Sequence, residues 1–280
     1  MTTIHEIVKI LTDSGIEPNE ANVEVKILIE HFAGYGVKDI LLGKKLDSEK
    51  LKIVEDKARL RAQTRQPIQH ITGFTDFMGE KFIVNPHVLI PRDETEFLVR
   101  KAVEIINKND YKMALDVGTG SGCIACMVAK HTDCQIIGLD ISADALNTAL
   151  DNASRLNLFN KAIFRKSDIF SNVKPGESFD IIISNPPYIP PSQKTHLQKE
   201  VSFDPETALF TDDEKGLEFY EKITSQAPKI LNNGGYLLYE LGINQAADVK
   251  RFMENAGFSA IEIIKDLAGI ERVICGKLDN

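Results

Sequence analysis

The sequence predicts an α/β protein whose mostly parallel sheet is preceded by a small helical domain. Up to about residue 66, apolar residues recur at helical spacing and no strand pattern interrupts them. From about residue 89, short apolar runs alternate with helical segments, which is typical of a parallel sheet with helices on both faces. A glycine-rich turn directly follows the first of these runs.

The first helices are indicated by apolar residues that repeat about every 3.6 positions. Gly15 and Gly43 mark breaks between helices, and Asp47 or Ser48 is placed to cap the helix that follows. Four basic residues on that helix are interpreted as a solvated face: Lys57, Arg59, Arg61 and Arg65. We therefore expect a helical domain over residues 1–70.

A linker and a larger domain are expected after this bundle. Residues 71–74 and 80–84 suit two short strands around a turn at Met78 and Gly79, so residues 71–88 are predicted to form a β-hairpin linker. The larger domain covers residues 89–280, and the acidic run that starts at Asp93 indicates the beginning of its first helix.

Seven strands are predicted in this larger domain. The last two are separated by a connection too short for a crossover helix and should form an antiparallel edge. The predicted strands are 114–117, 136–140, 162–165, 179–183, 236–240, 261–264 and 272–275.

Composition narrows the classes of function. The chain has 280 residues, 43% of them hydrophobic, and a formal net charge of -8. A protein that depends on phosphate contacts more often carries a basic surplus, so we expect no direct nucleic-acid binding. No apolar run reaches membrane-spanning length, and we expect a cytoplasmic monomer that binds no membrane.

A metal site is not expected. Cys123 and Cys126 form a C-x-x-C pair, but no second pair or nearby histidine pair completes a set of ligands. Both cysteines fall on the predicted buried face of a helix. We therefore interpret them as small core residues.

The glycine-rich turn is the first candidate for ligand binding. Glycines at alternate positions let the backbone turn tightly and approach a ligand closely. The spacing is neither that of the dinucleotide fingerprint nor that of a nucleotide-hydrolase phosphate loop. The turn consists of Gly118, Thr119, Gly120, Ser121 and Gly122.

Two carboxylates that follow later strands extend this candidate site. Asp140 lies about 20 residues further on and can accept the ribose hydroxyls of an adenosine, or alternatively cap the helix near Ser142. Asp168 is placed for an adenine amino group, with a turn carboxylate as the alternative, and Ile169 can pack on the ring. S-adenosylmethionine has this ribose and no pyrophosphate, so it is the expected cofactor.

The strand 179–183 ends in Asn185, Pro186, Pro187 and Tyr188, the expected catalytic and substrate-binding residues. Methylating a planar nitrogen requires acceptors aimed at its N–H bonds. Asn185 offers a side-chain oxygen and is also expected to contact the cofactor. Pro186 offers a carbonyl whose direction its ring restricts. Pro187 completes this substrate-binding turn, and Tyr188 offers a flat face for stacking. A simple Pro-Pro turn is the alternative.

These residues resemble a known family. The N-P-P-Y motif is similar to that of methyltransferases acting on glutamine, adenine or guanine nitrogens. The chain as a whole resembles the bacterial peptide chain release factor glutamine methyltransferases, the HemK/PrmC family. The resemblance is carried by residues 66–73, 88–96, 115–122, 184–189, 204–209 and 265–272.

The resemblance implies a Rossmann-like class I methyltransferase sheet and methylation of the glutamine in the Gly-Gly-Gln motif of class one release factors, in translation termination. It implies that Asn185 and Pro186 hold the glutamine amide, that Tyr188 stacks on it, and that the helical domain docks the substrate. Asp93 replaces the proline usual in the family. For Arg92 and Glu94 two roles stay open, shaping the cofactor pocket or a salt bridge at the helix start.

Two other functions remain as alternatives. The same N-P-P-Y motif would serve a nucleic-acid methyltransferase acting on exocyclic amines of adenine or guanine, which the acidic charge disfavours. An inactive cofactor-binding scaffold is disfavoured because all four residues of the motif are present.

Overall fold

A computed structural model describes residues 3–36, 38–39, 42–44, 46–266 and 268–279. The ends of the expected domains at Met1 and Asn280, and Leu267 of the block 265–272, lie outside this range. The chain divides into two compact units. The helical unit consists of Met1–Phe74 and Gln198–Phe203, and the sheet unit of Thr75–Leu197 and Asp204–Asn280.

The helical unit is built from amphipathic helices around one apolar core. Gly15, with a φ of 88°, ends the first helix as predicted, and the Asp47 side chain caps the helix that starts at Ser48 by accepting from two backbone N–H groups. Ile7, Leu11, Val25, Leu28 and Val54 are fully buried in its core. The helices that the structure describes in full in this unit are α1 (Ile4–Asp13), α2 (Pro18–Leu28), the π-helical turn η1 (Ile29–Ala33), α4 (Ser48–Thr64), α5 (Ile68–Thr72) and the short η3 (Lys199–Phe203).

A buried arginine joins the distant segment Gln198–Phe203 to these helices. The Arg61 guanidinium is 1% exposed and donates to Glu24 at 3.0 Å and to Glu200 at 2.8 Å. Arg65 also contacts Glu200, at 2.6 Å. The interpretation of the four basic residues at and near the end of α4 as a solvated face is therefore wrong for Arg61. The spacing of residues along one helix cannot reveal a carboxylate 139 positions away.

The predicted hairpin begins later than expected. Residues 68–72 form helix α5 and Gly73 ends it, so the expected strand at 71–74 is wrong except at Phe74, where β1 (Phe74–Phe77) begins. Met78 and Gly79 form the turn as predicted, both with positive φ, and lead into β2 (Glu80–Ile83).

The sheet unit has the predicted α/β fold. All seven predicted strands are present in a single sheet of order β5-β4-β3-β6-β7-β9-β8, in which β9 is antiparallel to both of its neighbours and the other pairs are parallel. The sequence did not reveal that β9 lies between β7 and β8. The strands are β3 (Met113–Val117), β4 (Gln135–Asp140), β5 (Ala162–Lys166), β6 (Phe179–Ser184), β7 (Leu231–Glu240), β8 (Phe258–Lys265) and β9 (Glu271–Leu278).

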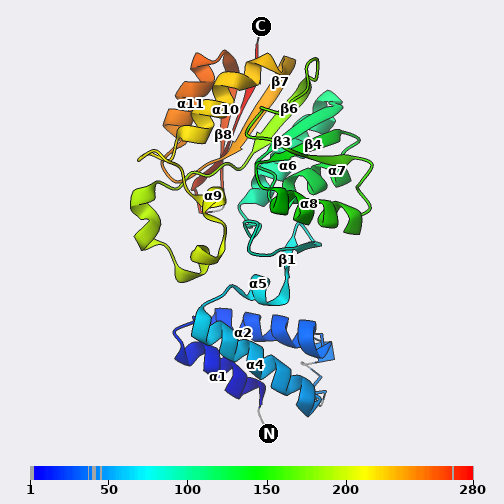
Figure 1. The fold of residues 1–280 in the computed structure, drawn as a ribbon, viewed down its shortest axis with the longest axis vertical. Helices are drawn as coiled ribbons and strands as arrows, with labels where there is room; N and C mark the ends of the chain where they lie inside the picture. The colour runs from blue at the N-terminus through cyan, green and yellow to red at the C-terminus, as the bar shows by residue number, and fades with distance from the viewer. Residues whose placement is uncertain (1–2, 37, 40–41, 45, 267, 280) are drawn as a thin grey trace. The chain divides into compact units, whose positions relative to one another are not determined.

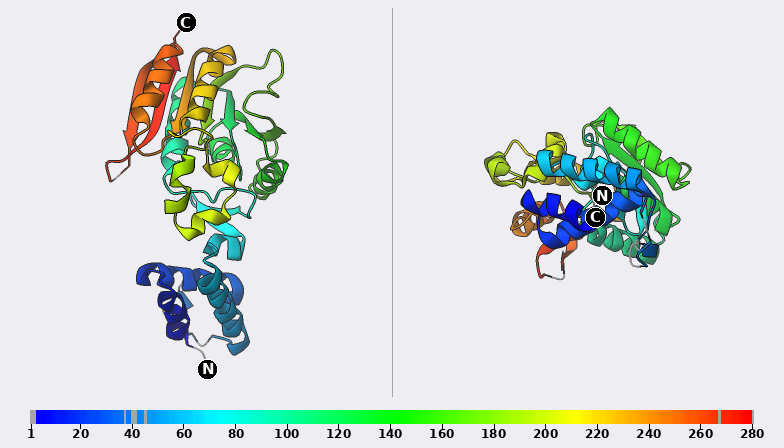
Figure 2. Two further views of the ribbon diagram at one scale, coloured as in Figure 1. Left: turned by 60° about the vertical axis from the view of Figure 1, so that its left-hand side comes forward. Right: turned by 90° about the horizontal axis from the view of Figure 1, so that it is seen from below.

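Helices cover both faces of this sheet (Figures 1 and 2). One core contains residues of α6 (Thr95–Asn109), α7 (Cys123–His131) and α8 (Ala143–Arg155). The core on the opposite face contains residues of α10 (Glu218–Gln226) and α11 (Ala246–Asn255). The connection between β6 and α10 carries η2 (Pro191–His196) and α9 (Glu206–Leu209), and η4 (Ala227–Lys229) follows α10.

Two cysteines of α7 belong to this covering layer. Cys123 and Cys126 are buried in the first core, as predicted, and burial raises the pKa of the Cys123 thiol to about 12. None of the described helices combines the length and the apolar character needed to cross a membrane.

Candidate active site

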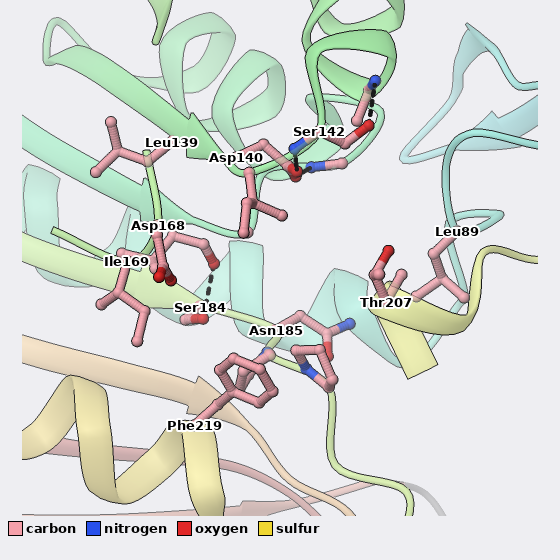
Figure 3. Close-up of a pocket in the computed structure, with 18 of the residues that line it drawn as sticks. Leu89, Leu139, Asp140, Ser142, Asp168, Ile169, Ser184, Asn185, Thr207 and Phe219 are labelled. Atoms are coloured by element: carbon pink, nitrogen blue, oxygen red, sulfur yellow. Dashed lines mark hydrogen bonds between the residues drawn. The ribbon is translucent and has the colours of Figure 1, made fainter. Parts of the chain in front are cut away.

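A pocket of about 420 Å³ lies at the carboxyl ends of the central strands. The chain passes from β3 through β4 to β5 at one edge of the sheet and then returns to β6, on the other side of β3. The strand order therefore reverses between β3 and β6, and α/β sheets bind ligands at such a reversal. The carboxyl ends of four strands supply residues to this pocket. Gly118 follows β3. Asp140, Asp168 and Asn185 come from β4 and from the segments after β5 and β6 (Figure 3). The structure thus brings together the main residues predicted from the sequence.

The glycine-rich turn contributes through two of its five residues. Gly118 and Gly120 line the pocket, and both have positive φ. Thr119, Ser121 and Gly122 are buried behind them. Thr119 donates to Asp116 at 2.6 Å, and a Cβ on Gly122 would lie only 2.9 Å from the Cβ of Ala149. These three residues support the turn from behind, and their predicted contacts with the cofactor stay predictions.

Asp140 ends β4 and lines the pocket, whereas the cap of the helix that follows is Ser142. One carboxylate oxygen accepts from the Gly120 N–H at 2.8 Å and the other from the Ser142 N–H at 2.9 Å, while Ser142 caps helix α8. Burial raises the pKa of Asp140 and these backbone hydrogen bonds oppose that rise. Each oxygen keeps lone-pair capacity for a ligand hydroxyl in the pocket that it lines.

Asp168 and Ile169 form the adjacent wall. Asp168 is exposed, and Ile169 is half-buried with a φ of 47°, a region that β-branched residues rarely adopt. Leu139, from β4, and Ile141, which is 56% exposed, add apolar surface to the same pocket. The resulting combination of carboxylates and apolar side chains suits a flat polar ring attached to a sugar.

Asn185 follows β6 directly and enters the middle of the pocket (Figure 3). The Ser184 hydroxyl donates to the carbonyl of Val117 at 2.7 Å and so ties the ends of β6 and β3 together. Pro186 is buried and Pro187 half-buried, and both line the pocket. The Asn185 side chain is therefore held at the same strand edge as the glycine-rich turn.

Tyr188 is not among the described residues that line this pocket. It lines a second cavity, of about 640 Å³, together with Gly242 and Gln245. Its ring covers Gly242, where a Cβ would meet it at 2.9 Å, and its carbonyl accepts from Gln245 at 3.0 Å. Burial raises the pKa of the Tyr188 phenol.

Arg92 and Glu94 make ion pairs. Arg92 contacts the buried Asp204 at 2.7 Å, and Glu94 contacts Arg272 at 3.3 Å. Burial raises the pKa of Asp204 to about 6, while Arg92 opposes the rise. Neither Arg92 nor Glu94 is among the described residues lining the first pocket. Of the two roles left open by the sequence, these contacts favour the salt bridge.

Several pocket residues were missed by sequence reasoning. Leu89 and Thr207 lie in blocks that carry the family resemblance but were given no role in the site, and Phe219 lies outside these blocks (Figure 3). Two buried residues behind Asn185, Thr95 and Glu240, were also missed. Glu240 had one usable signal, since it is a carboxylate at the end of an apolar strand.

The family comparisons agree with this geometry. A model described as "Methyltransferase small domain" matches residues 94–204. The crystal structure of a methyltransferase from Pyrococcus furiosus superposes with a TM-score of 0.54 at 20% identity, covering 73% of this chain and 91% of that one. That likeness shows the same fold. The domain match covers the central part of the sheet unit, from α6 to the segment before α9.

Curated relatives define the particular family. The chain is 39% identical over 232 residues to the release factor glutamine methyltransferase of Clostridium acetobutylicum, covering 82% of this chain and 81% of that protein. It is 36% identical over 261 residues to the release factor glutamine methyltransferase of Bacteroides thetaiotaomicron, covering 92% of each. The chain belongs to the release factor glutamine methyltransferase family, which confirms the resemblance found in the sequence.

Proposed function

We propose that this protein transfers the methyl group of S-adenosylmethionine to the side-chain amide nitrogen of the glutamine in the Gly-Gly-Gln motif of class one release factors. The observation that carries the proposal is the Asn185 side chain, which lies in the same pocket as the glycine-rich turn and Asp140. The family membership supports the choice of a protein glutamine as acceptor.

The residues of the pocket fit the cofactor. Gly118 and Gly120 offer backbone without side chains, and Asp140 has acceptor capacity for ribose hydroxyls. Asp168 and Ile169 border the remaining space, where an adenine ring would find one polar and one apolar partner. When bound, the cofactor would supply an electrophilic methyl group on a positively charged sulfur.

Asn185 and Pro186 would orient the substrate amide. The Asn185 side-chain oxygen and the Pro186 carbonyl accept from the two N–H bonds of the glutamine amide and stabilise the positive charge that develops on its nitrogen. Neither group is a strong base, so positioning is the main contribution and the proton leaves after methyl transfer. Pro187 shapes the same turn. We propose that the glutamine side chain approaches along the face of Tyr188, which lines the neighbouring cavity.

The second candidate function is methylation of exocyclic amines in nucleic acid. The net charge of -8 disfavours it, because phosphate contacts usually require a basic surface. The monomeric state, the cytoplasmic location, the absence of a metal and the docking role of residues 1–70 stay predictions.

The function is tested by methyl transfer from S-adenosylmethionine to a recombinant release factor, with DNA and ribosomal RNA as competing acceptors. We expect the factor to be labelled on one glutamine, located by mass spectrometry of its peptides. Asn185→Ala should reduce the rate on the order of 10²-fold, the typical effect of removing one group that stabilises transition-state charge. Asn107→Ala, an exposed asparagine on α6, is the matched control. Labelling of nucleic acid and not of the factor would overturn the proposal.

A further inference from the structure

Two buried residues form a hydrogen-bonded chain behind Asn185. Thr95 is the first residue of α6 and Glu240 the last residue of β7, and each is 3% exposed. The Thr95 hydroxyl donates to the Glu240 carboxylate at 2.6 Å. The Asn185 side-chain nitrogen donates to the Thr95 hydroxyl oxygen at 3.4 Å. The start of α6, the end of β7 and the residue after β6 thus meet at the side-chain amide of Asn185.

Which group donates in each of these two hydrogen bonds follows from the number of protons available. A threonine hydroxyl has one proton, and a carboxylate has none to donate. The Thr95 proton therefore points to Glu240, and the hydroxyl oxygen is left to accept from an N–H of Asn185. This arrangement holds the amide nitrogen of Asn185 toward Thr95. The amide oxygen is then turned away from Thr95 and available to a substrate N–H.

The electrostatic setting of Glu240 makes its ionisation sensitive to pH near neutrality. Burial raises the pKa of Glu240 to about 7, and the hydrogen bonds from Thr95 and Asn185 lower it. Among the other causes of this value, the charge of Glu94 raises the pKa of Glu240 and that of Arg272 lowers it. The other titratable groups that interact with Glu240 are Tyr188, Tyr220 and Cys123.

We propose that Thr95 and Glu240 are positioning residues that orient the Asn185 amide for methyl transfer, with the Glu240 carboxylate setting the direction of the hydrogen-bonded chain. The proposal rests on the proposed function, because it assumes that the Asn185 oxygen accepts from the substrate amide. If Glu240 becomes a glutamine or takes up a proton, it can donate to Thr95. The Thr95 hydroxyl is then free to donate to the oxygen of Asn185, which would turn the amide the wrong way.

The experiment compares Glu240→Gln, Thr95→Val and Thr95→Ser with the wild-type chain, using S-adenosylmethionine and a recombinant release factor. We expect Glu240→Gln and Thr95→Val to lower kcat roughly 10- to 100-fold, the scale of a misplaced reacting group. The KM for the factor and the calorimetric Kd for the cofactor should change less than about twofold, because neither residue lines the pocket. Thr95→Ser keeps the hydroxyl and should retain kcat within about threefold.

The pH profile separates positioning from a purely structural role. Wild-type kcat should rise as pH increases through about 7, where Glu240 ionises, and Glu240→Gln should lack this rise. Unchanged kcat and an unchanged pH profile in Glu240→Gln would overturn the proposal. Equal losses of kcat in Thr95→Ser and Thr95→Val would also overturn the proposal. This comparison tests the proposal even if Glu240→Gln does not fold.

Asn185→Ala separates a failure of the proposed function from a failure of the positioning role of Thr95 and Glu240. If Asn185→Ala turns over normally, the proposed role of Asn185 fails and the positioning role fails with it. If Asn185→Ala is inactive while Glu240→Gln and Thr95→Val are normal, the proposed function stands and only the positioning role is wrong.

Discussion

Ile169 holds a backbone conformation that is costly for its residue type. A β-branched residue at a φ of 47° is strained by roughly 1–3 kcal/mol. Its carbonyl accepts from the Ser167 hydroxyl at 2.8 Å, and the Asp168 N–H donates to the Ser171 hydroxyl at 3.0 Å. These local bonds hold the turn in a form that keeps Ile169 at the pocket wall.

Asp116, under the glycine-rich turn, should make the stability of the protein depend on pH. It is fully buried, and burial raises its pKa to about 7 although the hydrogen bond from Thr119 lowers it. A carboxyl whose folded pKa lies above its unfolded value near 3.8 favours folding below pH 4 and loses that contribution as pH rises to 7. The change is about 3–5 kcal/mol.

Denaturant unfolding of wild type and Asp116→Asn at pH 4.5 and pH 8 measures this effect. The free energy of unfolding of the wild type should fall by more than that of Asp116→Asn between the two pH values, since asparagine does not titrate. Asp110→Asn, at an exposed helix end, should follow the wild type. Equal pH dependence in Asp116→Asn and wild type would contradict the interpretation.

At the scale of the elements, the turn between β3 and α7 depends on close packing against α8. Gly122 has a φ of 77°, and a Cβ there would meet Ala149 at 2.9 Å. Gly176 has a similar φ of 84° but nothing within 4 Å of the same position. Gly176→Ala therefore isolates the cost of the backbone conformation, and Gly122→Ala adds the steric conflict.

We expect Gly176→Ala to reduce the free energy of unfolding by about 1–2 kcal/mol. Gly122→Ala should cost a further 1–3 kcal/mol or so, because overpacking forces shifts in a close-packed core. Denaturant titration of both variants gives the comparison. Equal losses of unfolding free energy in the two variants would mean that α8 shifts away from the added methyl group without loss of stability.

The strands of the sheet unit could be predicted because buried parallel strands appear as continuous apolar runs, as in residues 179–183. The boundary between α5 and β1 could not, since the short apolar segment around Ile71 fits a helix turn as well as a strand. The position of β9 inside the sheet edge was also hidden. A short connection shows that β8 and β9 are neighbours but does not say which one pairs with β7.

The candidate site was predictable where one segment carries the chemistry, as at Asn185 and at the glycine-rich turn. Thr95 and Glu240 were not predictable as a pair, because they lie 145 positions apart. Their hydrogen-bonded connection to Asn185 exists only in the folded protein. Tyr188 was predicted from the same motif as Asn185 and lines the neighbouring cavity, and its stacking role stays a prediction.

At the scale of the whole molecule, the helical unit depends on a segment from the second half of the chain. Glu200 accepts from Arg61 and contacts Arg65, and Arg61 is buried together with Glu24. We expect Glu200→Ala to reduce the free energy of unfolding of this unit by roughly 2 kcal/mol, because hydrogen bonds to charged groups contribute about 1.5–3 kcal/mol.

Limited trypsin digestion provides a second measurement of the same change. Lys199 adjoins Glu200 within η3, so cleavage there should be faster in Glu200→Ala than in wild type. Glu206→Ala, which removes an exposed ion pair with Lys194, is the matched control and should leave cleavage at Lys199 unchanged. Unaltered stability and cleavage in Glu200→Ala would show that the segment is held by other contacts.

The discontinuous helical unit also has a consequence for the order of folding during synthesis. Domains generally fold from the N-terminus as they leave the ribosome. Glu200 emerges 139 residues after Arg61, when β3 to β6 have already been made. The contact between the Arg61 guanidinium and Glu200 can therefore form only after most of the strands of the sheet have been translated. Although it comes first in the chain, the helical unit is completed late, after the pocket-forming strands β3, β4 and β6 have left the ribosome.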